Sequence, residues 1–260
     1  MIRSGTGLRM NEDTLQLWFA YPDDVLERGA AEACELLLSE EERARLKAFK
    51  FDRLRREYLA TRALVRTALA HTHPIAPEAW RFSSNAYGKP AVEPACGLQF
   101  NLSNSRELVV GLIATGAEVG VDVEPFTRAS EIAEVAPRVF SKLELAQLDG
   151  LPDSERLNRG LSLWTLKEAY IKARGMGLSL TLEKISFVFG GAEEIRLELD
   201  PSLNDEPSRW RFCLLDHAGH RIALMVEQAA DAELEIWEAR PLLAPPTRLP
   251  DCAVRWLPRS

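Results

Sequence analysis

The alternation of apolar and polar residues predicts a chain in which strands and helices are interspersed. Strand-like runs rich in β-branched and aromatic residues fall at 14–20, 100–103, 108–114, 119–124, 185–189, 210–215 and 222–226. Helical periodicity covers 27–38, a stretch from Ser39 to about Ala70, and a middle region, 131–174, that Pro152 interrupts. The last helix of that region, 161–174, is expected to end at Gly175.

The stretch that begins at Ser39 carries a capping signal and an unusual number of basic residues. Ser39 is followed three residues later by Glu42, the spacing of a capping box at a helix N-terminus. Arginines and lysines then recur from Arg43 to Arg66, beside an apolar stripe that can face a core. We interpret most of these cations as a solvated helix face.

Two short segments resemble one another. Both 77–82 and 182–187 follow a helix and contain a glutamate and a phenylalanine four residues apart, where a strand is expected to begin. Two similar α+β halves produce such a pattern. We place the halves at 1–115 and 116–235, followed by a tail, 236–260, whose five prolines predict irregular structure.

The composition excludes several classes of protein. The 260 residues carry a net charge of −7, which argues against general nucleic-acid binding. No window approaches the roughly 20 apolar residues that span a bilayer, and the first residues lack the apolar core of a signal peptide. Four cysteines, Cys34, Cys96, Cys213 and Cys252, are too scattered for a zinc or redox motif. We therefore expect a cytoplasmic protein.

Two carboxylates fall on one face of the strand expected at 119–124. Alternate residues of a strand point to the same side, so Gly120, Asp122 and Glu124 face away from the valines between them. One interpretation is a solvated strand face. The other is a polar site in which a cation offsets the repulsion between the two carboxylates.

A second polar constellation lies on the helix expected at 161–174. Trp164, Glu168 and Lys172 are spaced four residues apart and share one helix face. They could form only a surface ion pair beside a core tryptophan. Together with the strand, however, they offer three carboxylates and a lysine, and all-oxygen anionic ligation suits Mg²⁺. Such a set is suited to phosphoryl-type transfer, in which a metal and a cation offset charge on phosphate.

Two turns offer groups that suit phosphate. Gly88-Lys89-Pro90 places a lysine on a rigid turn, and Ser103-Asn104-Ser105 provides hydroxyls, an amide and backbone N–H groups at a strand end. Each could equally be no more than a turn.

These motifs, taken in order, resemble the Sfp-type 4′-phosphopantetheinyl transferases. That family pairs a Gly-x-Asp-x-Glu strand, here 120–124, with a Trp-x-x-Lys-Glu-Ala-x-x-Lys helix, here 164–172. A Phe-Ser-x-x-Glu element, here 140–144, lies between them. The Gly-Lys-Pro turn, the strand that begins at Phe100 and the basic helix precede them in the family's order. The resemblance covers roughly 39–187.

The resemblance implies an α+β fold of two similar halves in a pseudo-twofold relation, with the active site in the cleft between them. It implies Mg²⁺ held by Asp122, Glu124 and Glu168, with Lys172 on the phosphate of the substrate coenzyme A. It further implies that the coenzyme site is lined by Arg45, Gly88, Lys89, Pro90, Ser103, Asn104, Ser105, Asp122 and Lys172.

The implied reaction transfers the phosphopantetheine arm to a serine of an acyl or peptidyl carrier protein and releases adenosine 3′,5′-bisphosphate. Glu168 is the candidate for accepting the serine proton, and Glu144 is the reserve candidate. The family's carriers are acidic helical bundles, so a docking surface near the cleft is implied. We expect a monomer that binds neither nucleic acid nor membrane.

One residue departs from the family pattern. Asn104 stands where the family has a histidine, and an amide never carries the positive charge that an imidazole can. This substitution predicts weaker coenzyme binding than in a histidine-bearing relative.

Two other functions use some of the same residues. A magnesium-dependent phosphate-ester hydrolase could use the three carboxylates but has no need of the Gly-Lys-Pro and Asn-Leu-Ser elements. A non-catalytic module that binds coenzyme A or the carrier would not require the carboxylates or Lys172.

Overall fold

The computed structural model describes residues 14–23, 30–190, 194–227, 233–239, 245–250 and 256, and these residues form two compact units. The first unit comprises the described parts of 14–83 and 231–252, together with 90–116. The second comprises 84–89 and the described parts of 117–230 and 253–260.

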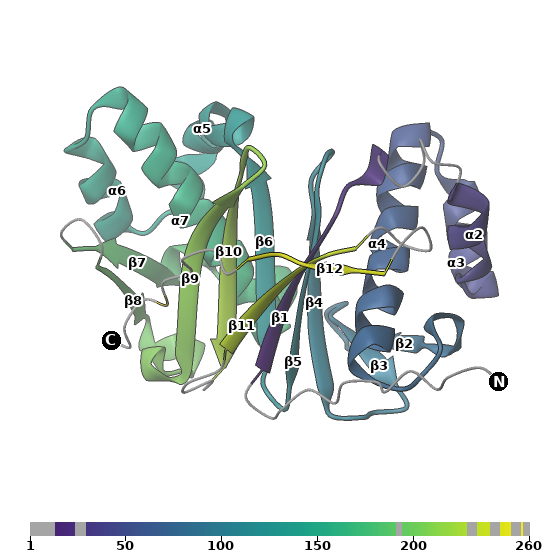
Figure 1. Ribbon diagram of the computed structural model, residues 1–260. Helices are drawn as coiled ribbons and strands as arrows, with labels where there is room; N and C mark the ends of the chain where they lie inside the picture. The colour runs from purple at the N-terminus through teal and green to yellow at the C-terminus, as the bar shows by residue number, and fades with distance from the viewer. Residues whose placement is uncertain are drawn as a thin grey trace. The chain divides into compact units, whose positions relative to one another are not determined.

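The first unit is a sheet with a long helix packed on it. The sheet has the order β12-β11-β1-β5-β4, made of β1 (Thr14–Ala20), β4 (Leu98–Asn104), β5 (Val109–Thr115), β11 (Glu233–Glu238) and β12 (Thr247–Arg248). Helix α4 (Asp52–Thr72) packs against β1, β4 and β5, and α2 (Ala31–Leu36) and α3 (Glu40–Ala48) pack on α4 (Figure 1). The short helix η1 (Pro77–Ala79) then leads into a hairpin of β2 (Arg81–Ser84) and β3 (Pro90–Glu93).

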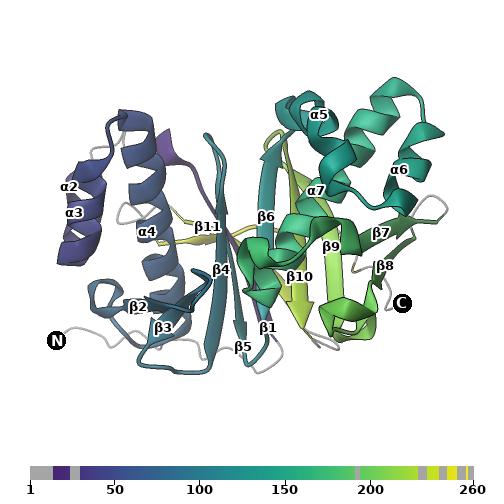
Figure 2. The ribbon, with the colours of Figure 1, turned by 180° about the vertical axis from the view of Figure 1, so that it is seen from behind.

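The second unit is built in the same way. Its sheet has the order β6-β10-β9, made of β6 (Val119–Pro125), β9 (Trp210–His217) and β10 (His220–Glu227). Helix α7 (Asp153–Arg174) packs on β6 and β10, and α5 (Ala129–Val139) and α6 (Lys142–Asp149) pack on α7 (Figure 2). A hairpin pairs β7 (Ile185–Phe189) with β8 (Ile195–Leu199). Short helices complete the unit: η2 (Phe126–Arg128), η3 (Gly177–Ser179), η4 (Leu182–Lys184), η5 (Pro201–Leu203) and η6 (Pro207–Arg209).

The two units repeat one topology, which confirms the prediction of two similar α+β halves. The elements correspond in chain order. Strand β1 corresponds to β6, α3 to α6, α4 to α7 and η1 to η4. The β2–β3 hairpin then corresponds to the β7–β8 hairpin, β4 to β9 and β5 to β10. The sheet orders β1-β5-β4 and β6-β10-β9 correspond strand for strand. The segments 77–82 and 182–187, whose similarity suggested the repeat, both run from a short helix into the first strand of a hairpin.

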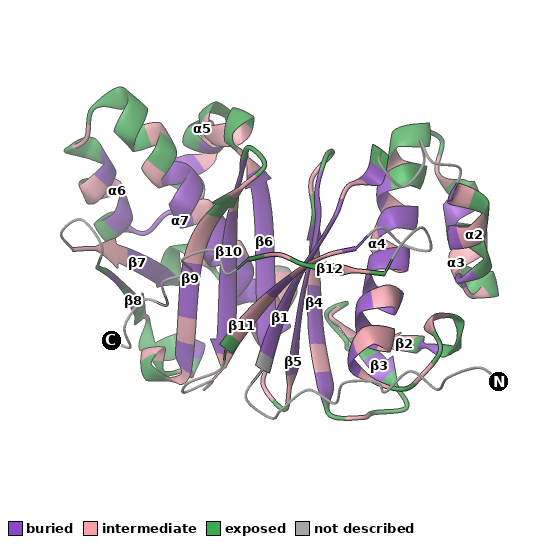
Figure 3. Ribbon diagram, in the orientation of Figure 1, coloured by how far each residue is buried: buried purple, intermediate pink, exposed green. Residues whose placement is uncertain are grey.

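Each unit has its own apolar core between helix and sheet. Trp18, Leu64 and Phe100 belong to the core of the first unit, and Leu166, Tyr170 and Phe212 to the core of the second. Figure 3 shows that the buried residues follow the sheets and the sheet-facing sides of α4 and α7.

Several element boundaries differ from those expected. The long basic stretch is two helices, because the backbone is extended at Phe49 and Phe51. The helix expected at 27–38 spans 31–36 in the described residues, and α7 begins directly after Pro152 rather than at Leu161. Strand β2 begins within the segment 77–82, where a strand was expected to begin. The strands β3, β8, β11 and β12 were not predicted; they are short, so their apolar pattern is weak.

The chain also passes between the units more often than the boundaries at 115/116 and 235/236 imply. Strand β11 pairs in parallel with β1, which places it in the first unit rather than in an irregular tail. Segment 84–89 belongs to the second unit. Both placements rest on pairings between residues far apart in sequence. In the part of the chain that the structure describes, no helix is long and apolar enough to cross a membrane.

Candidate active site

Strand β6 and helix α7 approach each other more closely than a side chain would permit. A Cβ atom built on Gly120 lies 2.0 Å from the carbonyl oxygen of Ala169 and 2.5 Å from the backbone nitrogen of Ala173. Only glycine fits there without moving one of the two backbones. Because of this contact, the polar face of β6 lies directly against the polar face of α7.

The first pair across this contact is Asp122 with Lys172. The Lys172 ammonium donates to Asp122 Oδ1 at 2.7 Å. The Asp122 side chain is only 6% exposed, whereas that of Lys172 is 27% exposed. Asp122 is therefore held in the interior, whereas Lys172 remains accessible to solvent.

The second pair joins Glu124 to Trp164. The indole Nε1 donates to Glu124 Oε1 at 2.9 Å, and Arg128, which follows β6 on η2, donates to the same oxygen at 2.5 Å. Although both contacts favour the ionised form, the pKa of Glu124 is raised, first by burial and then by the charge of Asp122. Residues 119–124 are all buried, so the alternative of a solvated strand face is excluded.

Glu168, on α7, is the third carboxylate of the site. Burial raises the pKa of its carboxyl above the ordinary value, and the negative charge of Asp122 raises it further, while Lys172 opposes the shift. Carboxylates that are buried or half-buried and repel one another, beside a lysine, are a mark of a functional site rather than of a stabilising core.

The carboxylates are engaged by cations of the chain itself. Across the described ranges, no group of three or more His, Cys, Asp or Glu side chains is close enough together to hold a metal ion. Lys172 and Arg128 instead neutralise Asp122 and Glu124. The donor set nevertheless fits a hard divalent cation, because three carboxylates supply oxygen ligands. Burial first, and then the charge of Asp122, raise the pKa of Glu124 and of Glu168, and a bound cation would offset both effects.

Glu144, the reserve candidate for the general base, is structural. Its side chain is 0% exposed, and its two oxygens accept from the backbone N–H groups of Phe187 and Ser141 at 2.9 and 2.8 Å. The buried Lys167 ammonium lies 2.5 Å from the same carboxylate and also donates to the carbonyls of Val139 and Leu182. The Phe-Ser-x-x-Glu element is thus the capping box of α6, tied to α7 by an ion pair. Such a carboxylate has no access to a substrate.

The first unit contains the same combination of a capping box and an ion pair to the following helix. Ser39 and Glu42 form the predicted capping box of α3, and the Glu42 carboxylate pairs with Arg62 and Arg66 of α4. Both guanidinium groups also stack over the Phe82 ring. These two arginines of the basic helix therefore hold the unit together.

The Gly-Lys-Pro turn lies against the end of α7. Gly88 has φ +89°, a conformation that favours glycine. The Lys89 ammonium pairs with Glu118 and donates to the Ala173 carbonyl at 2.7 Å, while Asn85 donates to the Gly175 carbonyl at 2.8 Å. The turn therefore satisfies carbonyls at the helix C-terminus, where Gly175 adopts the predicted left-handed cap with φ +61°.

The remaining predicted coenzyme residues belong to the first unit. Ser103 is buried in β4, Asn104 is exposed at the end of that strand, and the Ser105 hydroxyl accepts from Leu108 N at 3.1 Å within the turn before β5. Arg45 is exposed on α3, with its guanidinium 5.5 Å from the centre of the Tyr58 ring. Their roles toward a coenzyme stay predictions.

Three residues of this region were not singled out as site partners from the sequence. Arg128 lies four residues after Glu124, a spacing that could have suggested the pair. Lys167 lies within the recognised helix motif, but its partner Glu144 is 23 residues away, and only the packing of α6 on α7 brings them together. Asn85 forms its own turn by accepting from Tyr87 N, two residues further on, a pattern typical of asparagine.

The comparisons with known proteins show the family of the chain. Residues 118–225, which contain β6 and α7, match the family model of the 4′-phosphopantetheinyl transferase superfamily. The chain is 31% identical to 4′-phosphopantetheinyl transferase HetI of Nostoc over 75% of this chain and 82% of the relative. It is 28% identical to 4′-phosphopantetheinyl transferase Sfp of Bacillus subtilis over 72% of this chain and 83% of the relative.

Among solved structures, the holo-[acyl-carrier-protein] synthase of Neisseria meningitidis is similar at 19% identity and a TM-score of 0.38, over 43% of this chain and 97% of that one. At this score the likeness adds nothing to the assignment, which rests on the sequence relatives. The chain belongs to the 4′-phosphopantetheinyl transferase superfamily. It is accordingly a transferase that moves phosphopantetheine to carrier proteins.

Proposed function

We propose that the chain transfers the phosphopantetheine arm of coenzyme A to a serine hydroxyl of a carrier protein, using the residues that β6 and α7 bring together. The observation that carries this proposal is the contact of Gly120 with the α7 backbone, which sets Asp122 and Glu124 against Lys172 and Glu168. Neither a hydrolase nor a binding module is favoured by a separate observation.

Lys172 is the residue that contacts the transferring phosphate in this scheme. Its ammonium is held by Asp122 and is partly exposed, so it can meet an anionic substrate without being drawn out of the protein. A positioned cation offsets the charge that develops on phosphate during transfer. Glu168 accepts the proton of the attacking serine, a role for which a raised carboxyl pKa is appropriate. Adenosine 3′,5′-bisphosphate leaves.

The carboxylates of Asp122, Glu124 and Glu168 would hold Mg²⁺. When bound, the metal supplies charge neutralisation for the pyrophosphate. The chain's own contribution is to keep three oxygen donors on two elements whose spacing is fixed by Gly120. To ligate a metal through Oε1, Glu124 has to release Arg128.

We further propose that Arg45, Lys89 and the turn from Ser103 to Ser105 contact the coenzyme. The enzyme is proposed to act in the cytoplasm as a monomer, without nucleic acid or membrane as a partner. The net charge of −7 and the presence of both halves in one chain support this part.

Intact mass spectrometry of an apo carrier protein, incubated with the chain, coenzyme A and Mg²⁺, tests the proposal. We expect the carrier to gain one phosphopantetheine arm, and we expect EDTA to abolish the gain. A gain that persists in EDTA would remove the metal from the scheme, and release of inorganic phosphate without a carrier would favour a hydrolase.

A further inference from the structure

Arg221, on β10, lies beside Glu124 but outside the motifs that suggested the site. It is the cross-strand partner of Glu124, so the two side chains leave neighbouring strands on the same face of the sheet. Helix α7 covers that face. The Arg221 side chain is only 11% exposed, although it carries a charge. A buried charge next to a candidate metal ligand calls for an account of what it contacts.

Each nitrogen of the Arg221 guanidinium donates a hydrogen bond. Nε and Nη2 donate to the carboxylate of Asp216, on β9. Nη1 donates to the hydroxyl of Ser162, and Nη2 also donates to Asn158 Oδ1 at 3.1 Å, both on α7. The ring of Phe126, at the start of η2, has its centre 5.7 Å from the guanidinium carbon. Arg221 therefore joins β9 and β10 to the N-terminal half of α7.

This link lies next to the contact between α7 and Glu124. Ser162 precedes Trp164 by two residues, and the Trp164 indole donates to Glu124 Oε1 at 2.9 Å. Further along the same helix, the Gly120 contact sets the spacing of β6 and α7. Helix α7 is thus fixed to the sheet at two places, and Arg221 provides the one near Glu124.

The first unit has the same strand pairing without the charges. The last helix-facing pair of β6 with β10 is Glu124 with Arg221, and the last helix-facing pair of β1 with β5 is Ala20 with Val109. Ala20 and Val109 are fully buried in the core under α4. The first unit therefore has neither the carboxylate nor the arginine at this point.

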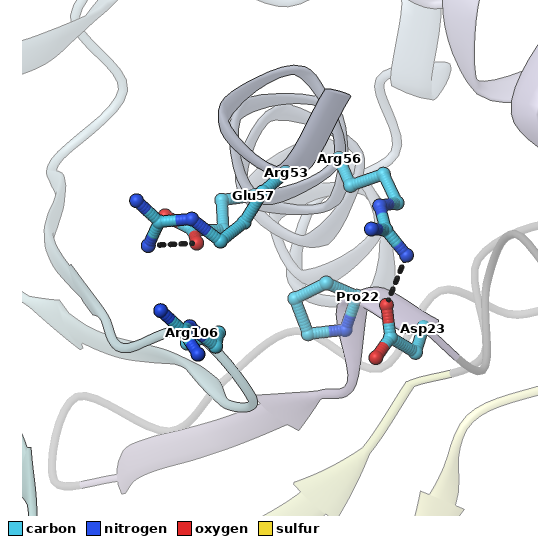
Figure 4. A pocket seen from close by; sticks show the side chains of 6 residues that line it. All are labelled: Pro22, Asp23, Arg53, Arg56, Glu57 and Arg106. Carbon is cyan, nitrogen blue, oxygen red and sulfur yellow. Dashed lines mark hydrogen bonds and ion pairs between the residues drawn. The ribbon is translucent and has the colours of Figure 1, made fainter. Parts of the chain in front are cut away.

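The place that Arg221 fills in the second unit corresponds to a pocket of about 320 Å³ in the first (Figure 4). Glu57 lines this pocket and lies nine residues before the buried Arg66, just as Asn158 lies nine residues before the buried Lys167. The complete lining is Pro22, Asp23, Arg53, Arg56, Glu57 and Arg106. The same topology thus forms without a side chain in this place, which indicates that Arg221 serves the site of the second unit rather than the fold.

We propose that Arg221 is a positioning residue for the transfer reaction. By holding the N-terminal half of α7 against β10, it keeps the Trp164 indole on Glu124 and so fixes the orientation of this carboxylate as a metal ligand. The inference rests on the proposed function, in which Glu124 helps to hold Mg²⁺. Arg221 itself contacts neither the metal nor the coenzyme in this scheme.

Mn²⁺ binding to the full-length enzyme, measured by electron paramagnetic resonance of the free ion without coenzyme A, tests the inference. Arg221→Met keeps an unbranched side chain but removes every hydrogen bond of the guanidinium. We expect it to weaken Mn²⁺ binding about tenfold, the usual loss when a group that orients a metal ligand is removed. Arg221→Lys keeps the charge and one donor group, so it should recover part of the loss. Transfer by Arg221→Met should fall at limiting Mg²⁺ and recover at high Mg²⁺.

A double variant distinguishes positioning from general stabilisation. Trp164→Phe removes the indole N–H that contacts Glu124 but leaves the partners of Arg221 in place. If Arg221 acts through Trp164, adding Arg221→Met to Trp164→Phe should weaken Mn²⁺ binding far less than it does in the unmodified enzyme. Equal losses in the two backgrounds would show that Arg221 does not act through this contact.

Arg209→Met is the matched control. Arg209 lies at the other end of β9, donates to the carboxylates of Glu227 and Asp205, and lies 5.0 Å from the centre of the Trp210 ring. Its replacement should lower the melting temperature but leave the Mn²⁺ dissociation constant unchanged. Circular dichroism spectra show whether each variant is folded.

The outcomes separate this inference from the proposed function. If the unmodified enzyme binds Mn²⁺ and transfers the arm, an unchanged dissociation constant in Arg221→Met overturns the role of Arg221 alone. If the unmodified enzyme neither binds Mn²⁺ nor transfers the arm, the proposed function fails together with the inference. If Arg221→Met does not fold, Ser162→Ala takes its place, because it removes one acceptor of Arg221 and should still weaken Mn²⁺ binding. An unchanged dissociation constant in Ser162→Ala would then overturn the inference.

Discussion

Gly120 lies so close to Ala169 that an ideal Cβ on the glycine would be 2.0 Å from the alanine's carbonyl oxygen. The contact joins the backbones of β6 and α7, the two elements that carry the site. Because the contact is between backbone atoms, no side-chain rotation can relieve a clash there. The spacing of Asp122 and Lys172 therefore depends on residue 120 having no Cβ atom.

Gly120→Ala is therefore expected to force β6 and α7 apart. We expect destabilisation at the upper end of the usual cost of overpacking, about 3 kcal/mol, together with a marked loss of kcat. Urea denaturation and steady-state kinetics measure the two effects. Gly160→Ala on α7 is the control, because its nearest neighbour would be an ordinary 3.9 Å away and alanine should stabilise the helix by up to about 1 kcal/mol. Equal stability of the two variants would contradict the close packing.

Glu168→Gln tests whether Glu168 contributes to catalysis without contributing to the stability of the fold. If Glu168 accepts the serine proton, kcat should fall about 100-fold or more. Because the carboxyl is half-buried and repelled by Asp122, removing its charge should leave the melting temperature unchanged or raise it. Glu134→Gln, an exposed acid on α5, is the control and should alter neither quantity. Near-normal turnover in Glu168→Gln would remove this residue from the mechanism.

Arg128 competes with a metal for Glu124 in the proposed scheme. Arg128→Gln should then tighten Mn²⁺ binding, by about tenfold if one charged hydrogen bond must otherwise be broken. Electron paramagnetic resonance of free Mn²⁺ measures the dissociation constant without turnover. Arg138→Gln, an exposed arginine on α5, is the control. Weaker Mn²⁺ binding in Arg128→Gln would mean that the guanidinium supports the metal site instead.

The buried contacts of Asp205 predict that the free energy of unfolding falls at low pH. Its side chain is 1% exposed and accepts from Tyr170 Oη at 2.7 Å, Trp210 Nε1 at 2.8 Å and the Arg174 guanidinium at 2.8 Å. Burial alone would raise the pKa of this carboxyl, but the hydrogen bonds and Arg174 together lower it below the ordinary value.

The Asp205 contribution is complete above the unfolded pKa of an aspartate, about 3.9, and is lost as pH falls through the lower folded pKa. Asp205→Asn should cost about 3 kcal/mol at pH 7, because Arg174 keeps a buried charge without its counter-ion. Its free energy of unfolding should also change less between pH 5 and pH 2.5. Parallel pH profiles for the variant and the unmodified chain would disprove the lowered pKa.

Asn104→His should lower the KM for coenzyme A. Asn104 is exposed at the end of β4, so an imidazole has room there. The protonated ring adds a charge-assisted contact to phosphate, and protonation requires a pH near or below about 6.5. The improvement should therefore be larger at pH 6 than at pH 8. Asn104→Gln adds no charge and serves as the control. An unchanged KM in Asn104→His at pH 6 would show that position 104 does not contact the coenzyme.

The sequence by itself determined the features that depend on neighbouring residues. The capping box of Ser39 and Glu42, the left-handed cap at Gly175 and the shared faces of Asp122 with Glu124 and of Trp164 with Lys172 all follow from local spacing. The repeated topology was also visible in two short segments, because each unit uses the same local turn from helix to strand.

Only the tertiary structure decided the features that depend on residues far apart in the chain. In the tertiary structure, Glu144 is the buried partner of Lys167, and Lys89 donates to a carbonyl at the end of α7. Strand β11 pairs with β1. Local periodicity reports which face of an element is apolar, but not which other element covers that face. For the same reason, the sequence offered the carboxylates and the lysine as separate motifs, and the packing of α7 on Gly120 made them one site.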